Sequence, residues 1–357
     1  MKKQTKMISC KHCGAEIAAS AKVCPHCGGK NKKPLYKRVW FWILIVLILI
    51  AAVSCGSGSN SNETKKIGEV SSKGNSQNTE KNQDETAVQT VYHVGDILHD
   101  GNMDIVYVAS GDYVSENPYV KPTEGKKYIF MKFAFCNTSD KSDSSVSSLS
   151  FACFADGYAA DSYYGGEDDI SATLSAGRST MGNVYFEVPE DAQEIEVEYE
   201  TNFFASKKIT FVYEGNQDSG YTLEKQTAAT EGALKPGDSL KGKTLNIQYL
   251  SCEEDSSDNP FINPKDGCGY ITCTFEFQNV SSSDVTVTSF SFDCYADGVS
   301  CDAAYFRDDN ISATLSAGRK AKGTVTFEVP LDAEVIEVEY LTNYWTSNRV
   351  VFDASIA

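Results

Sequence analysis

Alternation of apolar and polar residues dominates the chain from about residue 91 to its end. Successive side chains of a β-strand point to opposite faces, so this period of two predicts strands with one buried side. The apolar positions of two such strands are Ile129, Met131, Phe133 and Phe135, and Leu149, Phe151 and Cys153. Gly, Pro, Asn and Asp separate the strands, and no amphipathic helix interrupts them. The pattern predicts a mainly β fold built from antiparallel β-sandwiches.

The strand pattern occurs twice. At an offset of 141, residues 149–206 and 290–347 are identical at 34 of 58 positions, including the nine residues ISATLSAGR. This level of identity indicates a duplicated domain of about 120 residues. The predicted domains are 91–213 and 233–353, joined by a polar linker at 214–232.

The order L-S-A-G followed by G-x-V-x-F-E-V-P resembles the telokin-like immunoglobulin-fold domains of unknown function in surface proteins and lipoproteins of Gram-positive bacteria. The resemblance covers both repeats. It implies two tandem immunoglobulin-like sandwiches that are extracytoplasmic, non-catalytic and without an agreed ligand. The repeated motif then reads as a short strand and a turn, which leaves Arg178 and Arg319 as candidate contacts to nearby acids or to a ligand.

An uncharged run at 39–55 predicts one transmembrane helix, because about 16 apolar residues with flanking lysines come close to the hydrocarbon thickness of a bilayer. Residues 1–38 carry ten basic residues and one acidic residue, a charge of +9, whereas the rest carries 22 basic and 48 acidic residues, a charge of −26. The positive-inside rule predicts a single-pass protein of the cell membrane with its N-terminus in the cytoplasm and its C-terminal domains outside.

Residues 56–90 are rich in Gly, Ser, Asn and Lys and predict a disordered linker between membrane and repeats. An alternative makes the apolar run a signal peptide that ends in AVSC, with the mature lipoprotein anchored at Cys55. That alternative removes everything before Cys55. The two routes therefore predict different N-termini.

Two Cys-x2-Cys pairs near the N-terminus predict a structural zinc ribbon at 8–29. The ligands are Cys10, Cys13, Cys24 and Cys27, and a glycine follows each second cysteine. Four thiolates fill a tetrahedral zinc site and leave no open position for catalysis. A redox Cys-x-x-Cys is the weaker interpretation. The surrounding lysines favour contact with anionic lipid over nucleic acid, and no nucleic-acid partner is expected for the acidic domains outside.

Acidic residues precede the repeated motif in both copies: Glu167, Asp168 and Asp169 in the first, and Asp308, Asp309 and Asn310 in the second. Clustered carboxylates outside a cell predict a candidate calcium or ligand contact. Charged residues that protect a sheet edge are the alternative.

Cysteines differ between the copies. A two-residue Asp-Gly turn at 297–298 places Cys294 opposite Cys301 and predicts a disulfide there. Cys252 and Cys268 flank the loop that contains NPFINP and form a second predicted pair, which leaves Cys273 single. Buried free thiols are the alternative.

No catalytic group recurs in both repeats, so the chain is not predicted to be an enzyme. The GDSLKGKT stretch fits a phosphate loop only by letters, because a strand pattern rather than a helix follows it. The leading hypothesis is a membrane-anchored protein with a cytoplasmic zinc ribbon that binds an envelope protein or glycan. A transmembrane sensor that relays an envelope signal to the ribbon is the alternative hypothesis.

Overall fold

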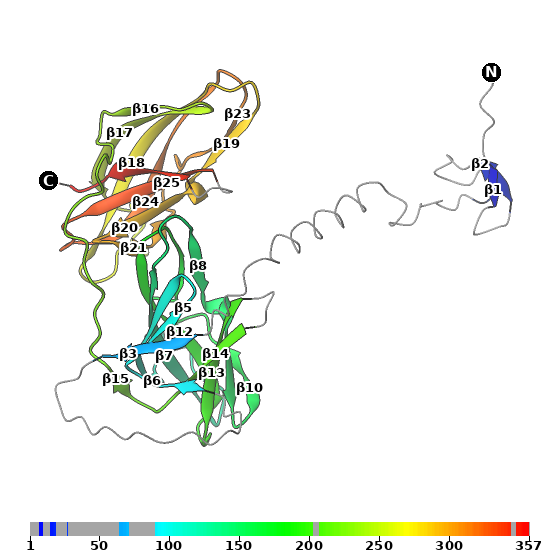
Figure 1. The fold of residues 1–357 in the computed structure, drawn as a ribbon, viewed down its shortest axis with the longest axis vertical. Helices are drawn as coiled ribbons and strands as arrows, with labels where there is room; N and C mark the ends of the chain where they lie inside the picture. Colours follow the sequence, from blue (N-terminus) through cyan, green and yellow to red (C-terminus); the bar gives the residue numbers. More distant parts are fainter. Residues whose placement is uncertain are drawn as a thin grey trace. The chain divides into compact units, whose positions relative to one another are not determined.

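The computed structural model describes residues 7–9, 15–18, 27, 64–70, 90–202, 207–343 and 348–356. The chain forms two compact units, Met1–Ser61 and Asn62–Ala357. Figure 1 shows the strands of the second unit in order from cyan to red.

The first unit contains a small antiparallel pair, β1 (Met7–Ser9) and β2 (Glu16–Ala18), with Ile8 opposite Ile17. These strands flank the first predicted zinc pair. Cys27 lies in an exposed turn. Cys10, Cys13, Cys24, the predicted span 39–55 and Cys55 lie outside the described residues. Within the part of the chain that the structure describes, no helix is long and apolar enough to cross a membrane.

The first repeat folds into two sheets. One contains β3 (Lys65–Glu69), β5 (Asp96–Asp100), β6 (Met103–Tyr113), β7 (Lys126–Asn137) and β12 (Ser179–Pro189). The other contains β10 (Tyr158–Ser162), β9 (Phe151–Ala155), β13 (Ile195–Asn202), β14 (Lys207–Val212) and β4 (Val91–Tyr92). β10 also pairs with β12, so it joins the two sheets at one corner. A separate pair, β8 (Ser144–Ser147) and β11 (Ser171–Leu174), carries the start of the repeated motif.

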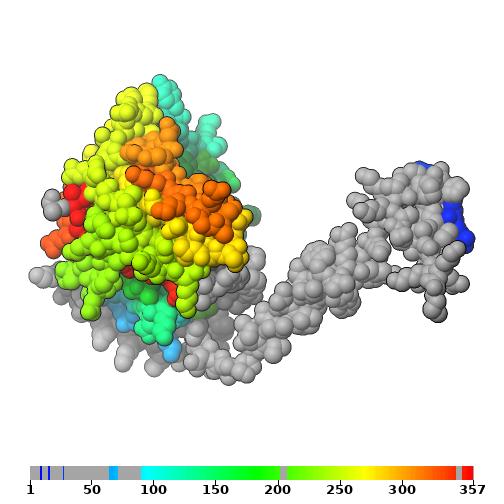
Figure 2. All heavy atoms as spheres, turned by 90° about the horizontal axis from the view of Figure 1, so that it is seen from above, coloured from blue at the N-terminus to red at the C-terminus, as the bar shows by residue number. Residues whose placement is uncertain are grey.

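The second repeat has the same plan. One sheet contains β16 (Ser239–Lys241), β17 (Leu245–Asp255), β18 (Cys268–Asn279), β24 (Lys320–Pro330) and β22 (Ala303–Ala304). The other contains β21 (Val299–Cys301), β20 (Phe292–Ala296), β25 (Ile336–Asn343) and β26 (Asn348–Asp353). β19 (Val285–Thr288) and β23 (Ser312–Leu315) correspond to β8 and β11. In Figure 2 this repeat is coloured from yellow-green to red.

Each repeat closes over its own aromatic core, which confirms the predicted sandwiches. The ring centroids of Phe133 in β7 and Phe211 in β14, from opposite sheets, lie 4.8 Å apart. Phe275 in β18 and Phe352 in β26 repeat that contact at 4.8 Å. Edge-to-face packing of this kind adds to the stabilisation from area burial alone. The four predicted core positions of β7, Ile129, Met131, Phe133 and Phe135, are all fully buried.

Leu149 departs from the sequence pattern. The structure places it in a 3₁₀ turn, η2 (Ser148–Ser150), where it is 76% exposed. The hydroxyl of Ser147 accepts a hydrogen bond from the Leu149 backbone N–H at 3.2 Å, and this turns the chain before β9 begins. The corresponding turn in the second repeat is η3 (Ser289–Ser291).

The repeated motif ends in a turn that is held by a buried asparagine. Asn137 Nδ2 donates to the carbonyl of Leu174 at 2.9 Å, and its own carbonyl accepts from the N–H of Gly177 at 2.9 Å. Asn279 holds Gly318 with the same geometry in the second repeat. Gly177 and Gly318 both have a φ of 77°, a backbone conformation that favours glycine. The nine identical residues are therefore explained first as a structural joint.

Two segments predicted as linkers contribute short strands to the first sandwich. Lys65–Glu69, inside the predicted disordered stretch 56–90, pairs with β5. β15 (Gln217–Asp218), inside the predicted linker 214–232, pairs with β6. Edge strands offer free backbone N–H and C=O groups, and pairing with them needs no apolar side chains. Apolar periodicity does not detect such strands.

Candidate functional site

One of the three acidic residues before the motif in the first repeat, Asp168, forms an ion pair with the second repeat. Asp168 Oδ1 lies 2.8 Å from Nζ of Lys265, and the same ammonium lies 2.9 Å from Asp302. Glu167 is exposed. Burial raises the pKa of Asp169, whose Oδ1 has no hydrogen-bond donor within the described residues. The predicted triad is therefore split between one ion pair, one solvated carboxylate and one partly buried carboxylate.

The second acidic cluster is held by an arginine that the sequence analysis did not select. Arg307 Nε and Nη2 lie 2.8 and 3.1 Å from the two carboxylate oxygens of Asp309, and its Nη1 lies 2.8 Å from Asp255. Asn310 donates to the carbonyl of Arg307 at 2.7 Å, and Asp308 is exposed. In the described ranges, no three His, Cys, Asp or Glu side chains are grouped to hold a metal ion. A calcium site stays a prediction.

Arg178 is the predicted site residue with the most developed surroundings. It is 6% exposed, and its Nε and Nη2 lie 2.9 and 2.7 Å from Glu339 Oε1 of the second repeat. Nη2 also lies 2.6 Å from Glu337, and its guanidinium carbon lies 4.6 Å from the ring centroid of Tyr295. Burial alone lowers the pKa of Arg178, but the charge of Glu339 and hydrogen bonds to both glutamates raise it overall.

The backbone between the repeats completes this network. The N–H of Thr230 donates to Glu337 Oε1 at 2.6 Å, and the side-chain amide of Gln226 donates to the other oxygen at 3.1 Å. Gln226 also accepts from Arg178. Glu337 is fully buried, and each of its oxygens has a donor, as a buried charge requires. The segment between the repeats is therefore part of the interface.

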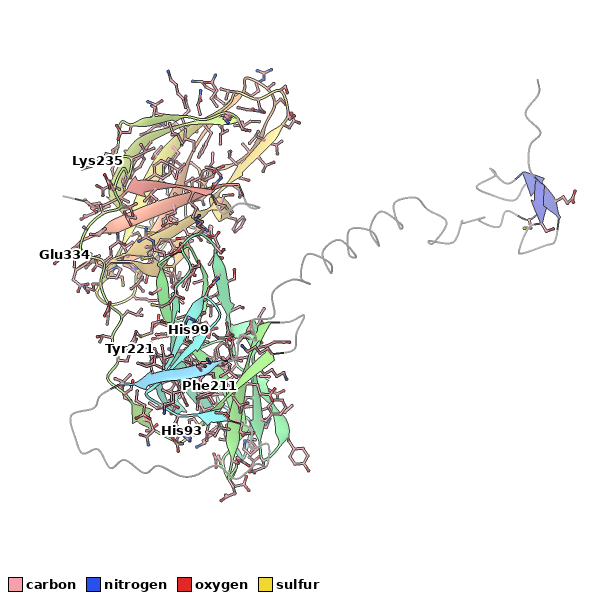
Figure 3. All side chains as sticks on the ribbon, viewed as in Figure 1. His93, His99, Phe211, Tyr221, Lys235 and Glu334 are labelled. Carbon is pink, nitrogen blue, oxygen red and sulfur yellow. The ribbon has the colours of Figure 1, made fainter. Side chains whose placement is uncertain are left out.

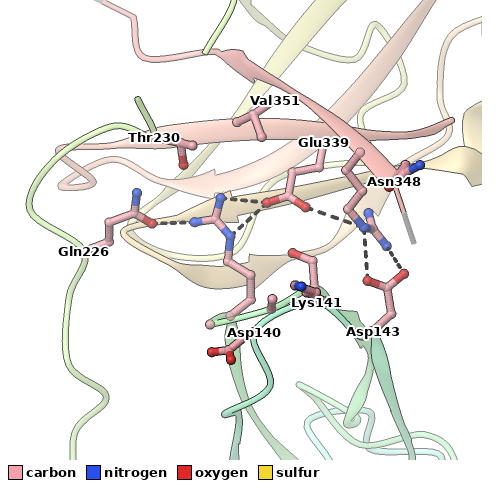
Figure 4. Close-up of a pocket in the computed structure, with 13 residues that line it drawn as sticks. Asp140, Lys141, Asp143, Gln226, Thr230, Glu339, Asn348 and Val351 are labelled. Carbon is pink, nitrogen blue, oxygen red and sulfur yellow. Dashed lines mark hydrogen bonds and ion pairs between the residues drawn. The ribbon is translucent and has the colours of Figure 1, made fainter. Parts of the chain in front are cut away.

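A second arginine joins the repeats from the opposite direction. Arg349 of β26 lies 3.1 Å from Asp143 of the first repeat and 2.5 Å from Asp293 of its own. Its Nε lies 3.7 Å from Glu339, so one glutamate connects both arginines. Figure 4 shows the ion pairs of Glu339 with both arginines and of Arg349 with Asp143, around a cavity of about 500 Å³ that the turn Ser175–Arg178 helps to line. We name this network, Arg178, Gln226, Glu337, Glu339, Arg349, Asp143 and Asp293, the junction.

Arg319, the counterpart of Arg178, is exposed, although its turn has the same backbone. The identical motif therefore has two different surroundings. The sequence marked both arginines as candidates but did not indicate Glu337, Arg349 or Asp143. In the IEVEY strand, Glu337 and Glu339 alternate with apolar residues and therefore point away from the core of their own sandwich. That alternation was the sequence feature that could have indicated them as interface residues.

No arrangement of general base and nucleophile occurs in the junction. His93 and His99 lie apart in the first repeat, as Figure 3 shows. His93 Nδ1 lies 3.1 Å from Glu214, and His99 Nδ1 lies 2.6 Å from Asp104. The junction contains two arginines that are ion-paired with its carboxylates, which suits a structural contact rather than proton transfer.

Exposed aromatic side chains at equivalent loop tips were missed by the sequence analysis. Tyr119 in the β6–β7 loop is 94% exposed, and Phe261 in the β17–β18 loop is 93% exposed. Each follows an Asn-Pro pair. Asn117 Oδ1 accepts from the Tyr119 N–H at 3.0 Å, and Asn259 Oδ1 accepts from the Phe261 N–H at 3.1 Å. The sequence feature that could have revealed them is the alignment of NPYV at 117–120 with NPFI at 259–262, because both copies have an aromatic residue after the Asn-Pro turn.

The strand register of the cysteines agrees with the predicted position of Cys294 opposite Cys301 and gives Cys252 a different neighbour from the predicted one. Cys294 stands opposite Cys301, across a turn in which Asp297 and Gly298 have φ values of 50° and 84°. Cys252 stands opposite Cys273 rather than Cys268. The β17–β18 ladder runs on to Asp255 and Tyr270, so the residue that faces Cys252 lies deeper in β18 than Cys268.

Residues 92–209 and 218–350 each match one protein family, described as Domain of unknown function (DUF4352). The chain belongs to this family. The two matches correspond to the two sandwiches, and the second begins at β15, inside the predicted linker. The junction therefore joins two DUF4352 domains.

Several solved structures are similar to part of the DUF4352 pair. A candidate lipoprotein, ycdA, of Bacillus subtilis subsp. subtilis str. 168 is 13% identical over 32% of this chain, with a TM-score of 0.29, and the chain spans 37% of its length. The yjhA protein of Bacillus subtilis is 13% identical over 34% of this chain and 99% of its own, with a TM-score of 0.29. The secreted protein MPT63 of Mycobacterium tuberculosis is 16% identical over 35% and 99%, with a TM-score of 0.28. No curated protein matches the chain.

Proposed function

We propose that this chain is an extracytoplasmic binding protein, held at the cell membrane, whose two DUF4352 domains contact an envelope protein or glycan through their aromatic loop tips. The observation that carries the proposal is the pair Tyr119 and Phe261. They are the most exposed large apolar side chains of the described residues, and they occupy the same place in both domains.

Loop-tip aromatics of this kind support binding rather than folding. Neither side chain is part of a core cluster, so folding gains little from it. Aromatic residues are enriched among the few residues that dominate binding energy, and rigid loops on a scaffold commonly carry them. The Asx turns of Asn117 and Asn259 hold both tips in place, which reduces the entropy lost on binding.

The junction supports a two-site mode of binding. It holds the two domains together, so both loop tips stay in a defined relation to one another. A partner with repeated features, such as a glycan or a repetitive envelope protein, then gains avidity from the second contact. A lone domain lacks this advantage.

Anchoring at the membrane is proposed in two forms. In one, residues 39–55 span the membrane and the zinc ribbon with Cys10, Cys13, Cys24 and Cys27 lies in the cytoplasm. The strands β1 and β2 on either side of the first cysteine pair are compatible with a ribbon. In the other, Cys55 is the lipid-modified first residue of the mature protein and the ribbon is removed. The mass of the intact membrane-extracted protein distinguishes the two forms.

The test of binding measures how much envelope material is captured by full-length wild-type protein and by full-length loop-tip variants, all held in native membranes. Envelope extract is captured on wild-type protein, on a Tyr119→Ser/Phe261→Ser variant and on a Tyr158→Ser variant, with and without calcium. Tyr158 is 80% exposed but lies at a different turn, so it controls for loss of an exposed aromatic ring. We expect capture to fall at least tenfold in the double variant alone. Equal capture by all three proteins contradicts the proposal.

A further inference from the structure

Cys252 and Cys273 lie in direct contact in the second DUF4352 domain. They are direct partners in the antiparallel ladder of β17 and β18, and their sulfur atoms lie 3.0 Å apart. Directly opposed residues in such a ladder have Cα atoms about 4.5 to 5.5 Å apart, which is within the range that a disulfide spans. The two side chains therefore point at one another from adjacent strands.

The two thiols differ in access and chemistry. Cys273 is fully buried, and its Sγ lies 3.6 Å from the Tyr249 hydroxyl, which donates to the Asp353 carbonyl at 3.1 Å. Cys252 is partly exposed. The hydrogen bond from Cys273 lowers the pKa of the Cys252 thiol, and a hydrogen bond from the Glu253 N–H adds to this against the opposing effect of burial. A partly exposed thiol with a lowered pKa is the reactive member of such a pair.

The first DUF4352 domain shows that the fold does not need this pair. Ser110 and Met131 occupy the positions of Cys252 and Cys273, and the Ser110 hydroxyl instead donates to the Gly215 carbonyl at 2.8 Å. Cys153, which corresponds to Cys294, is buried alone, and burial raises its pKa to about 12. The opposed thiols are therefore an addition to the second domain.

We propose that Cys252 and Cys273 form a cross-strand disulfide in the second DUF4352 domain. The proposal rests on the extracytoplasmic location given under the proposed function, because disulfides persist in oxidising compartments. Cys294 and Cys301 form a second opposed pair in the same core.

The bond forms by two exchanges with a disulfide oxidant, either a low-molecular-weight disulfide or a protein disulfide. The Cys252 thiolate attacks one sulfur of the oxidant and displaces the other as a thiolate. The Cys273 sulfur then loses its proton, attacks Cys252 Sγ and releases the second thiolate of the oxidant. Two protein thiols lose two electrons and two protons, and one oxidant disulfide becomes two thiols.

Register excludes the competing partner for Cys252. Cys268 lies at the start of β18, five residues from Cys273, and pairs with Pro330 of β24 on the other side of the ladder. Cys294 belongs to the opposite sheet. Only Cys273 faces Cys252 across the same ladder.

Peptide mapping under non-reducing conditions tests the pairing in two arms. In one, purified full-length protein is incubated with oxidised glutathione. In the other, thiols are blocked in intact cells before the full-length protein is purified. Cleavage with trypsin and chymotrypsin separates all five cysteines of the second domain, into segments 251–261, 266–270, 271–275, 293–295 and 296–305.

We expect a link between 251–261 and 271–275 in both arms, with Cys153 recovered as a thiol. The variants Cys252→Ser and Cys273→Ser should each abolish the link, whereas Cys268→Ser should leave it unchanged. Cys252→Ser introduces the residue type of Ser110 in the first domain, so it should fold. A link to 266–270 or to 293–295, or a stable glutathione adduct on Cys252, overturns the pairing itself. A correct link with glutathione but blocked, unlinked thiols from cells overturns the disulfide in the cell.

Discussion

The guanidinium of Arg178 in the first DUF4352 domain donates two hydrogen bonds, 2.7 and 2.9 Å long, to Glu339 in the second domain, 161 residues away. Both side chains are buried. A buried ion pair stabilises little compared with an apolar contact, but removal of one member leaves an uncompensated charge. This asymmetry makes the junction sensitive to single substitutions.

Arg178→Ala should destabilise the second domain relative to the first. Loss of the guanidinium leaves the buried Glu337 without its cation and leaves Glu339 with Arg349 alone, at a cost of about 3–5 kcal/mol. Differential scanning calorimetry should show the transition of the second domain at a lower temperature. Small-angle scattering should show a larger radius of gyration if the domains part.

The matched control for that substitution is Arg319→Ala. Arg319 has the same sequence context and the same turn but is exposed, so its removal should change stability by less than about 0.5 kcal/mol. Equal effects of both substitutions contradict the role assigned to the junction.

Acid should weaken the junction through Glu337. Burial alone raises the pKa of its carboxyl, but hydrogen bonds from Thr230 and Arg178 and the charge of Arg178 lower it below its ordinary value of 4.5. A lowered pKa in the folded state contributes stability above the ordinary pKa that is lost as pH falls through the folded pKa. Urea unfolding of wild type and Glu337→Gln between pH 7 and pH 3 should converge toward the acid end. Parallel curves across that range contradict this assignment.

Asp297 should be important for folding of the second domain. Its carboxylate accepts from the N–H groups of Glu334 and Val335, each at 2.9 Å, while its own backbone has a φ of 50°. Asp297→Ala removes both hydrogen bonds and places alanine in a left-handed conformation, which should cost roughly 2–4 kcal/mol. Asp297→Asn keeps an acceptor and tolerates that backbone, so urea denaturation should show a smaller loss.

The disulfide proposed above should stabilise only the second domain. Closing the loop from Cys252 to Cys273 contributes roughly 3 kcal/mol by unfolded-chain entropy, or about 10 °C in the melting temperature of a domain of this size. Calorimetry with and without a reducing agent should shift one transition and leave that of the first domain in place. A shift of both transitions by the same amount points to another cause.

Zinc in the N-terminal segment should be independent of the sandwiches. Full-length protein in its uncleaved form should contain one zinc ion per chain by elemental analysis, and Cys27→Ser should remove it because structural sites need all four ligands. The melting transitions of the two DUF4352 domains should be unaffected. A zinc content that does not respond to Cys27→Ser contradicts the ribbon.

Local rules predicted much of the fold. The buried face of β7 follows from alternation at Ile129, Met131, Phe133 and Phe135. The Asp-Gly turn correctly placed Cys294 opposite Cys301, because a two-residue hairpin fixes its own register. The same alternation wrongly predicted that Leu149 is a buried strand residue. Its backbone N–H donates to the Ser147 hydroxyl, and the chain makes a turn there before the strand begins.

Local rules predicted less of the candidate site than of the fold. Arg178 was selected from the repeat, but its partners Glu337 and Glu339 lie in another domain. The loop-tip residues Tyr119 and Phe261 look like ordinary apolar residues until their exposure is known. The sequence did not indicate that Cys252 faces Cys273, because the length of the β17–β18 ladder is not visible in it.

The sequence by itself determined two duplicated β-sandwiches and the conformation of the ISATLSAGR turn, because alternation, glycine and asparagine act over a few residues. Only the tertiary structure decided that Arg178 is buried in the junction while Arg319 faces solvent. The two motifs are identical, so the difference cannot be encoded within them. It arises because the first domain has a neighbour whose glutamates meet its turn, and contacts of that kind depend on which surfaces the folded chain brings together.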